Sequence, residues 1–267
     1  MIDTNGVRTM ATAVDLSRMT KARDLAHAEV AKLLSTRTVR WVILAELALI
    51  ALAESGAVES GAVSSTKLAT SDGVRTLLVH GGLAAVMSLI IGVTISAGEY
   101  RHGTIADTFL STPRRTPVLL AKFWIAAIVG LVAGVLSSAV ALTTALIWYS
   151  EKGVSFGAGD GTVVRALAGV TAWHVLYAVM GVALGALIRA QSAAIVTALV
   201  WIFIAETAVA SLAVSLGRWL PATAARSLGY DSSSGLLAQV GGGVILALWA
   251  AAFCVGAVVV TLRRDVV

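Results

Sequence analysis

Four ionisable side chains lie within segments that are otherwise apolar, where polar chemistry is unusual. They are Glu46, Glu54, Glu206 and His174. A charge in hydrocarbon is costly, so intramembrane carboxylates either serve a substrate or proton path or stay protonated and hydrogen-bonded inside the bundle. Both interpretations fit these glutamates. His174 has no carboxylate or cysteine at ligand spacing in the sequence, so we expect no metal site.

Aromatic residues lie close to two of these ionisable positions. Trp173 and Tyr177 flank the histidine. Trp201 and Phe203 precede the last glutamate. Such a set can line a cavity for an amphipathic substrate, although ordinary helix packing is the alternative for each member. The candidate substrate-path residues are Glu46, Glu206, Trp173, His174, Tyr177, Trp201 and Phe203.

The polar segment 98–117, GEYRHGTIADTFLSTPRRTP, separates two apolar segments and carries the signals of a short helix. Thr104 can cap such a helix, and Asp107 three residues later repeats the capping-box spacing. Ile105 and Phe109 share one face at i, i+4, which gives the helix an apolar patch outside the membrane. Proline follows threonine at Pro113 and again at position 117, which predicts two sharp turns. The segment is either a solvated connector or, as we favour, a surface that docks a partner, with three arginines for acidic groups or lipid phosphates.

The chain that carries these features is far more apolar than a soluble domain. Of its 267 residues, 58% are hydrophobic and only 13% are charged, and the mean hydropathy is +0.88. A bilayer span needs about 20 apolar residues because the hydrocarbon core is about 30 Å thick. We therefore predict an all-α integral membrane protein with six transmembrane helices. The predicted spans are 41–58, 77–97, 119–148, 163–188, 193–216 and 240–262.

The distribution of basic residues predicts how the spans are oriented. If the N-terminus is cytoplasmic, one side of the membrane carries 14 of the 20 lysines and arginines and the other side carries 6. Cytoplasmic flanks retain positive charge, so we expect both termini in the cytoplasm and a multi-pass protein of the plasma membrane. The pI of about 9.7 then reflects topology and contact with anionic lipids. We find no nucleic-acid-binding motif and expect no nucleic-acid partner.

Residues 1–38 form a predicted cytoplasmic region ahead of the six-span domain, 39–267, and they lack the early apolar run of a cleavable signal. The stretch TKARDLAHAEVAKLLSTRTVRW places apolar residues at helical spacing between charged ones. This pattern predicts an amphipathic helix in the cytoplasmic interface. The helix is either a basic topology anchor or a connecting helix that docks a partner. At the opposite surface, residues 217–237 predict short helices before the last span.

Two spans contain small-xxx-small patterns, GLVAG at Gly130 and Gly134 and GVALG at Gly181 and Gly185. Such patterns let helices approach closely. Because the pattern is common, we favour packing within one subunit over a contact between subunits.

The sequence contains no catalytic or nucleotide-binding motif. There is no G-x-x-x-x-G-K-[ST] loop, no G-x-S-x-G elbow and no H-E-x-x-H pair. The single cysteine, Cys254, excludes an intrachain disulfide. We therefore expect no enzymatic activity and no cofactor in this chain, and any driving energy has to come from another protein or from a gradient.

Three separated stretches resemble the permease subunits of type-two ATP-binding-cassette (ABC) exporters. EYRHGTIADTFLSTPRRTPVLLAK resembles the family's first cytoplasmic loop, where E-[YF]-x-x-G-T-[IL] precedes a short helix, a Thr/Ser-Pro turn and a lysine that enters the third span. AEVAKLLSTRTVRW is similar to the family's S-E-x-x-K-L-x-[ST]-x-[KR] segment, and TLRRDVV to its basic C-terminal end. The loop is the specific part of the resemblance.

The resemblance implies a permease that pairs with a second copy or a paralogous permease and is driven by a separate ABC ATPase, which binds ATP and Mg. The loop between the second and third spans would be the coupling helix, and closure of the ATPases would switch the membrane cavity from inward to outward facing. The implied activity is efflux of an amphipathic small molecule, lipid or peptide. The residues implied in ATPase coupling are Glu99, Tyr100, Arg101, Gly103, Thr104, Ile105, Asp107, Phe109, Pro113, Arg114 and Arg115.

Two other classes of function fit part of the sequence. An ion- or proton-coupled secondary transporter would use Glu46 and Glu206. That class expects paired spans interrupted by Gly or Pro, which are not evident, and gives the capped loop no role. A non-transporting membrane scaffold or sensor subunit would lack a substrate cavity.

Overall fold

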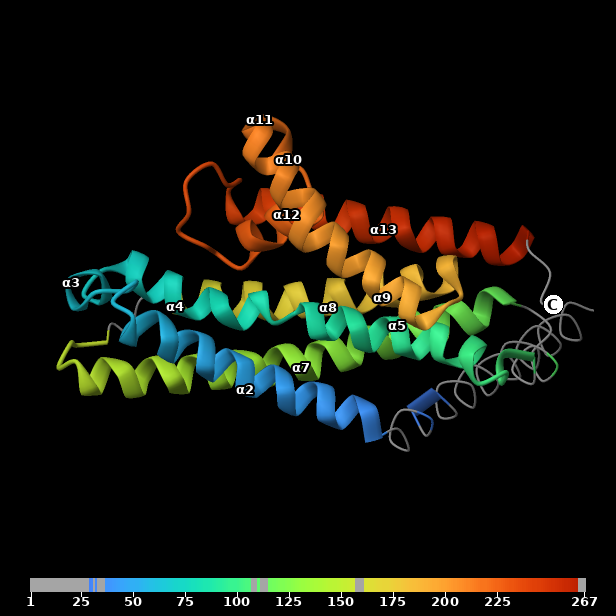
Figure 1. Cartoon of the computed structure of the whole chain (residues 1–267), viewed down its shortest axis with the longest axis horizontal. Helices are drawn as coiled ribbons and strands as arrows, with labels where there is room; N and C mark the ends of the chain where they lie inside the picture. The colour runs from blue at the N-terminus through green and yellow to red at the C-terminus, as the bar shows by residue number, and fades with distance from the viewer. Residues whose placement is uncertain are drawn as a thin grey trace, which may run out of the picture.

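The computed structural model describes residues 29, 30, 32, 37–106, 110, 115–156 and 161–263. Within these residues the regular structure is helical, without strands, and six segments are long and apolar enough to cross a membrane (Figure 1). The predicted all-α chain with six apolar spans is confirmed. The helices are α2 (Arg37–Glu59), α3 (Ser65–Leu68), α4 (Ser71–Leu83), α5 (Val86–Arg101), α7 (Arg115–Glu151), α8 (Gly161–Ile188), α9 (Gln191–Val200), η1 (Trp201–Ala205), α10 (Glu206–Leu212), α11 (Val214–Gly217), α12 (Pro221–Leu228) and α13 (Gln239–Arg263).

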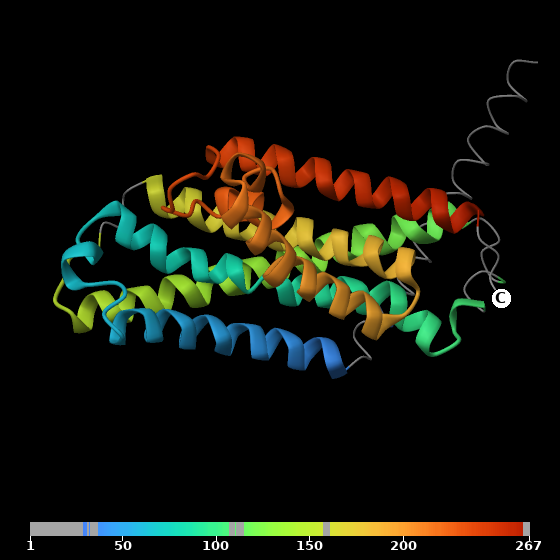
Figure 2. The same cartoon turned by 45° about the horizontal axis from the view of Figure 1, so that its top comes forward.

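Helix α8 forms the centre of the bundle. It packs against α4, α5, α7 and α13, while α2 lies on one outer side of the bundle and α13 on the opposite side (Figure 2). Its buried residues include Trp173, His174 and Tyr177. These three candidate site residues therefore face the protein interior and not lipid.

Glycines bring α8 close to its neighbours. A Cβ at Gly181 of α8 would overlap the carbonyl oxygen of Leu89 in α5, and a Cβ at Gly92 of α5 would overlap the carbonyl oxygen of Ala178 in α8. The two glycines of the GLVAG pattern in α7 lie in the same way against the α8 backbone. Both small-residue patterns thus serve packing within one subunit, as predicted.

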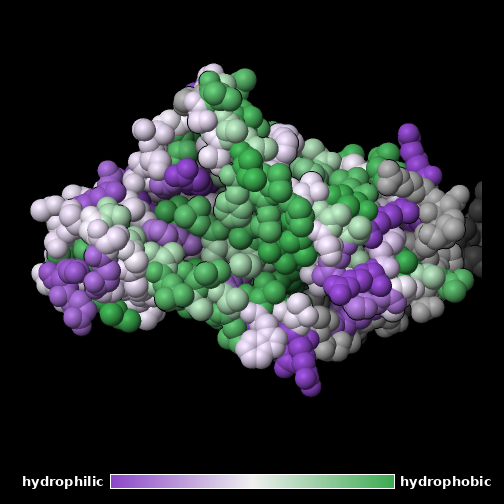
Figure 3. All heavy atoms as spheres, viewed as in Figure 1, coloured by the Kyte–Doolittle hydropathy of each residue, from purple (hydrophilic) through white to green (hydrophobic). Residues whose placement is uncertain are grey.

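The long helices alternate in direction, which gives the bundle two ends. We call the end at which α5 ends and α7 begins the loop end, and the other the α3 end (Figure 1). The start of α2 and the end of α13 both lie at the loop end. On the face shown in Figure 3, apolar residues cover the middle of the molecule and polar residues gather towards both ends. This distribution, with six candidate spans, is that of a multi-pass membrane protein.

The second span is broken near its middle, which the sequence pattern does not indicate. Between α4 and α5 the backbone N–H of Ala85 donates to the carbonyl oxygen of Gly82, three residues back, at 2.9 Å. Bonds of this 3₁₀ type tighten a helix locally. Gly82 lies against the ring of Trp173, which a Cβ at this position would overlap. The broken segment therefore makes room for an aromatic side chain of α8.

The fifth span ends earlier than predicted. The predicted range is 193–216, whereas the apolar helical segment is Gln191–Leu212 and the chain bends at Ala213. Ala213 has φ −142° and ψ 78°, which lies outside the helical region. Hydropathy continues across this bend because the residues after it are also apolar, so the pattern alone gives no boundary.

A π-helical turn, η1, interrupts the same span. The backbone N–H of Glu206 donates to the carbonyl oxygen of Trp201, five residues back instead of the four of an α-helix. Such a turn contains an extra residue and changes the direction of the side chains that follow. π-turns are frequent at functional sites, and this one directly precedes an intramembrane glutamate.

Two predicted elements outside the spans are described in part. Helix α12 forms between the fifth and sixth spans, where short helices are predicted. Of the predicted amphipathic helix, the residues described ahead of α2 are Glu29, Val30 and Lys32, and all three are helical. Glu29 is buried and Val30 is exposed. An apolar side chain that faces outward fits a helix in the membrane interface, whereas the carboxylate of Glu29 is buried among other charged side chains instead of facing solvent.

Candidate functional site

A cavity of about 580 Å³ lies between α4, α8, α10 and α12. The lining combines aliphatic and aromatic side chains with a few polar groups, which is the usual composition of a small-molecule site. Its lining residues include Val79, Leu83, Trp173, Tyr177, Phe203 and Glu206.

The α8 wall of the cavity is aromatic. Trp173 and Tyr177 are four residues apart, so they lie on the same helix face. Their rings meet edge to face, with centroids 5.8 Å apart and an interplanar angle of 81°. Both residues are buried, yet Trp173 Nε1 and Tyr177 Oη have no hydrogen-bond partner among the described residues. The wall therefore offers two aromatic side chains to whatever occupies the cavity.

Glu206 supplies the acidic group of the cavity. It is 2% exposed, and its Oε2 accepts a hydrogen bond from the backbone N–H of Ala222 at 2.7 Å. Ala222 follows Pro221 at the start of α12, where backbone N–H groups lack helical partners and favour a negative charge. Oε1 of Glu206 has no partner among the described residues. One oxygen thus anchors α12, and no basic side chain of the described residues forms an ion pair with the carboxylate.

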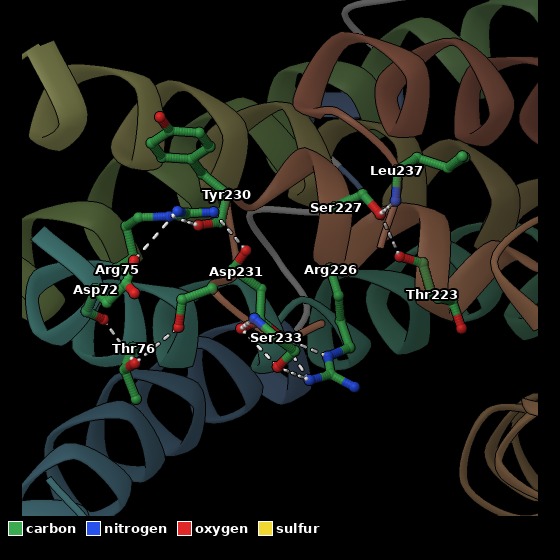
Figure 4. Close-up of polar contacts among 11 residues, drawn as sticks. Asp72, Arg75, Thr76, Thr223, Arg226, Ser227, Tyr230, Asp231, Ser233 and Leu237 are labelled. Carbon is green, nitrogen blue, oxygen red and sulfur yellow. Dashed lines mark hydrogen bonds and ion pairs between the residues drawn. The ribbon is translucent and has the colours of Figure 1, made fainter. Parts of the chain in front are cut away.

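The α3 end of the cavity is closed by a polar network around Asp231 (Figure 4). The Arg226 guanidinium donates to Oδ2 of Asp231 from Nε at 2.9 Å and from Nη2 at 2.6 Å. Ser233 donates to Oδ1 of Asp231 through its backbone N–H and its hydroxyl. The charges of Arg226 and Asp231 therefore neutralise each other at the rim of the cavity.

A second arginine ties this network to α4. Arg75 donates from Nε to the carbonyl oxygen of Tyr230 at 2.8 Å and from Nη2 to that of Asp231 at 2.7 Å (Figure 4). Its guanidinium also lies 4.2 Å from the centroid of the Tyr230 ring. Tyr230 has φ +63°, a left-handed conformation that is unfavourable for a non-glycine residue. The three contacts with Arg75 stabilise this turn.

The aromatic candidates do not all reach the cavity. Phe203 lines it, although its side chain is 60% exposed at the surface, whereas Trp201 is outside the lining and 47% exposed. His174 is fully buried on another side of α8. The structure thus brings together four of the seven candidates: Trp173, Tyr177, Phe203 and Glu206.

Of the three candidates outside the cavity, Glu46 and His174 bind each other between α2 and α8. His174 Nε2 lies 2.6 Å from Glu46 Oε1, which also accepts a hydrogen bond from Ser137 at 3.0 Å, and all three residues are fully buried. His174 Nδ1 is 2.8 Å from the carbonyl oxygen of Val170, which can only accept, so Nδ1 carries a proton. The contact between Nε2 and Oε1 then holds one proton, and the pair carries no net charge. A neutral pair is a low-cost way to keep a glutamate in the membrane interior.

Double-mutant analysis tests this structural role. Replacing Glu46 or His174 alone with leucine should lower the free energy of unfolding by about 3–5 kcal/mol, because each change leaves a buried polar partner unsatisfied. The double variant, with two apolar side chains, should be more stable than the sum of the single effects predicts. Thermal unfolding in detergent measures all three variants, and strictly additive effects would contradict the pairing.

Four charged side chains form a buried cluster at the loop end. We call Glu29, Lys32, Glu99 and Lys122 the ion cluster. Lys122 Nζ lies 2.8 Å from Glu29 Oε2 and 2.9 Å from Glu99 Oε1. Lys32 Nζ lies 3.0 Å from Glu29 Oε1 and 2.6 Å from Glu99 Oε1. The cluster has two charges of each sign, and it joins the segment before α2 to α5 and α7.

Lys32 is the most accessible member of the ion cluster. Burial lowers its pKa, but hydrogen bonds and charge attraction from Glu99 and Glu29 outweigh this effect and raise the pKa above its ordinary value of 10.5. A raised lysine pKa contributes stability that is complete below the unfolded value and is lost as pH rises through the folded value. Lys32 is therefore ionised at physiological pH.

The residues after α5 show how the segment that resembles a coupling loop begins. Gly103 has φ +71°, a left-handed conformation that glycine adopts readily after a helix C-terminus. The backbone N–H of His102 donates to the carbonyl oxygen of Gly98 at 3.0 Å, which completes the last turn. The glycine of the GT pair thus turns the chain away from α5. Thr104 follows in this turn, and Ile105 is helical and buried.

The charged and aromatic residues at this end of α5 contact other helices of the same chain. Arg101 Nη1 lies 3.5 Å from Oε1 of Gln191 at the start of α9. The guanidinium of Arg189 lies 5.4 Å from the centroid of the Tyr100 ring. Arg115, at the start of α7, donates to the carbonyl oxygen of Thr261 in α13 at 3.0 Å. Three of the implied coupling residues, Tyr100, Arg101 and Arg115, therefore contact the α8–α9 connection, α9 and α13 of the same chain. The candidates Asp107, Phe109, Pro113 and Arg114 lie outside the described residues.

Sequence reasoning did not select three members of the ion cluster as site residues. Glu29, Lys32 and Lys122 occur in the stretches that carry the family resemblance. Glu29 and Lys122 are 93 residues apart, so no local spacing links them. The usable signal was the presence of a lysine at the start of an apolar span, where burial requires a carboxylate partner.

Neither a family model nor a curated protein matches the chain. Among the residues that the structure describes, no group of three His, Cys, Asp or Glu side chains could hold a metal ion. The arrangement instead offers a cavity with an acidic group, and an ionic connection between the elements at the loop end.

Proposed function

We propose that this chain is the membrane-spanning permease subunit of an ABC exporter. It forms the path for an amphipathic small molecule, lipid or peptide in the plasma membrane, with the loop end in the cytoplasm. A separate ABC ATPase binds ATP and Mg and supplies the energy, and a second permease, identical or paralogous, completes the pathway.

The observation that carries this proposal is the ion cluster. Glu29, Glu99 and Lys122 belong to the stretches that resemble the exporter family, yet they are far apart in sequence. In the structure they contact one another at the loop end. Convergence of separate motif residues is expected if the motifs serve one purpose, and it supports a common role in receiving a partner.

The fold provides a route by which movement at the loop end can reach the cavity. Helix α5 carries the loop segment at one end, and its close glycine contacts join it to α8. Helix α8 in turn carries Trp173 and Tyr177 in the cavity wall. An ATPase that binds the loop differently in its open and closed states would therefore bias two arrangements of this wall.

Docking of the ATPase is the most direct test of the proposal. Arg101→Glu and Phe109→Ala are expected to weaken co-purification of the partner ATPase about tenfold or more, because one reverses a charge and the other removes an apolar anchor. Membrane insertion should be unchanged. Quantitative pull-down from solubilised membranes measures the complex.

Arg218→Glu is the matched control for the charge reversal. Arg218 is exposed near the α3 end, so its reversal should leave the complex intact. If neither loop variant changes complex formation or ATP-driven export, the coupling role is wrong. Transport that continues after ATP depletion would instead favour a proton-coupled transporter, in which the unbonded oxygen of Glu206 would serve as the proton site.

A further inference from the structure

The cavity brings an acidic side chain together with two aromatic ones. They belong to Glu206, Trp173 and Tyr177, each of which is at most 3% exposed and lines the cavity. The carboxylate of Glu206 accepts a hydrogen bond from the backbone N–H of Ala222 but forms no ion pair among the described residues. An acidic group without a countercharge in a mainly apolar lining favours an occupant of positive charge.

We infer that the cavity binds an amphipathic organic cation, an apolar molecule that carries a protonated amine. The ammonium group contacts Glu206, and the apolar part lies against Trp173, Tyr177 and Phe203. The inference deepens the proposed function, and it rests on that function only where it treats the bound molecule as cargo.

The charged and titratable groups that face the cavity leave one acidic group without a countercharge. Arg226 and Asp231 are bound to each other. His80 directs Nδ1 to a backbone carbonyl oxygen of its own helix at 3.0 Å. Glu206 accepts a hydrogen bond from the backbone N–H of Ala222, and no basic side chain within the described part of the chain forms an ion pair with it. The cavity therefore favours a positive ligand.

A cation with N–H groups satisfies this site better than a neutral or anionic molecule of the same size. Oε1 of Glu206 requires a donor, and a buried carboxylate is stabilised by a positive charge close to it. A neutral hydroxyl would provide the hydrogen bond without the charge, and an anion would meet the carboxylate at short range. The aromatic rings add apolar contact and cation–π attraction.

The cavity opens towards the lipid-facing surface, which explains why the ligand is amphipathic. Leu83 and Phe203 both line the cavity, and they are 46% and 60% exposed. The surface in the middle of this face of the molecule is apolar (Figure 3). A molecule dissolved in the membrane can thus enter between α4 and α10 with its apolar part leading.

Matched fluorescent probes test the charge preference. The purified full chain in lipid nanodiscs is titrated with dansylcadaverine, which is a primary amine, and with the neutral alcohol that has the same dansyl group and pentyl chain. Dansyl emission reports transfer to an apolar site, and empty nanodiscs give the background. We expect the amine to bind at least tenfold more tightly than the alcohol, and equal affinities would overturn the inference.

Glutamate-to-glutamine substitutions at two positions test which residue causes the preference for the amine. Glu206→Gln retains an oxygen that can accept the Ala222 N–H but removes the charge, so the amine should bind no better than the alcohol. Glu54→Gln is the matched control, because Glu54 is also fully buried in a span but does not line the cavity. This variant should keep the preference. A preference that survives Glu206→Gln would contradict the inference.

A surface variant keeps the test decisive if Glu206→Gln does not fold. Phe203→Ser changes an exposed residue at the mouth of the cavity and should weaken both probes about fivefold. Unchanged affinities would place the probes elsewhere and overturn the inference.

The inference and the proposed function can fail separately, because binding of the probes needs no ATPase. Charge-selective binding without a co-purifying ATPase would contradict only the proposed function. ATP-driven export without charge selectivity would contradict only the inference.

Discussion

Replacing Lys122 with methionine is expected to lower the free energy of unfolding by about 3–5 kcal/mol, the usual effect of breaking a buried ionic interaction. Lys122 is 2% exposed, and its Nζ contacts Glu29, Glu99 and the carbonyl oxygen of Ile95. Without it, two buried carboxylates share Lys32 as their remaining cation in the cluster. The midpoint of thermal unfolding should fall by roughly 10 °C.

The single cysteine gives a direct measurement of this loss. Cys254 is half-buried in α13, so a thiol-reactive dye reports its exposure as the detergent-solubilised protein is heated. Lys67→Met is the control, because Lys67 is an exposed lysine at the α3 end, and its replacement should leave the midpoint within experimental error. Adding Glu29→Gln and Glu99→Gln to the Lys122 variant should recover part of the loss. Equal shifts at Lys67 and Lys122, or no recovery, would show that the cluster does not stabilise the fold.

Replacing Gly181 with alanine, which adds one methyl group, is expected to lower the free energy of unfolding nearly as much as the Lys122 substitution. Alanine normally favours a helix by about 1 kcal/mol relative to glycine. Here its Cβ would overlap the carbonyl oxygen of Leu89 and meet the Cα of Gly92 at 3.0 Å. Backbone atoms cannot rotate away, so α5 and α8 have to separate. We expect this separation to lower the free energy of unfolding by about 1–3 kcal/mol, and to cancel the gain in helix propensity as well. The same thermal assay should therefore show a lower midpoint for Gly181→Ala.

Gly256→Ala provides the matched control for the close approach of α5 and α8. Gly256 lies in α13, and no atom comes within 4 Å of a Cβ placed there. Its replacement should leave the protein as stable as before or slightly more stable, since only helix propensity changes. If Gly181→Ala behaved in the same way, the close approach of α5 and α8 would not be needed for stability.

Hydropathy and helical spacing were sufficient to predict the six spans, because a bilayer imposes a minimum apolar length on each helix. The same measure could not locate the bend at Ala213 or the break between α4 and α5. Neither interruption introduces charge or proline. Both depend on what packs against the chain, such as the Trp173 ring over Gly82, and such contacts are absent from a local pattern.

Residue types predicted several of the residues that line the cavity, but they did not predict which way each side chain points. Trp173 and Tyr177 share a face because they are four residues apart, whereas the adjacent His174 is turned by about 100° and meets Glu46 instead. Trp201 and Phe203 are two residues apart and point in different directions, so only Phe203 lines the cavity. Once one residue of a helix is known to face the cavity, helical geometry alone shows which of its neighbours face it too.

The ion cluster was beyond local reasoning for a different reason. Glu99 lies 67 residues from Lys32, and a tertiary contact of this kind leaves no spacing in the sequence. The contact also buries the carboxylate of Glu29, which the amphipathic pattern places on the solvent-facing side of the helix. A charged residue in an amphipathic pattern is predicted to face solvent, unless a buried partner of opposite charge changes the balance.

The π-helical turn before Glu206 has a consequence for how this chain can vary. The extra residue in η1 sets the rotational phase between α9 and α10. Substituting any side chain in the turn leaves that phase unchanged. Deleting one residue from the turn would return the span to α-helical geometry and leave the side chains after it in their present directions, because the turn holds one residue more than a regular helical turn. A further insertion would instead rotate everything after it by about 100°, with a shift of about 1.5 Å along the axis. The number of residues in this span, and not only their identity, therefore decides which side chain reaches the interior.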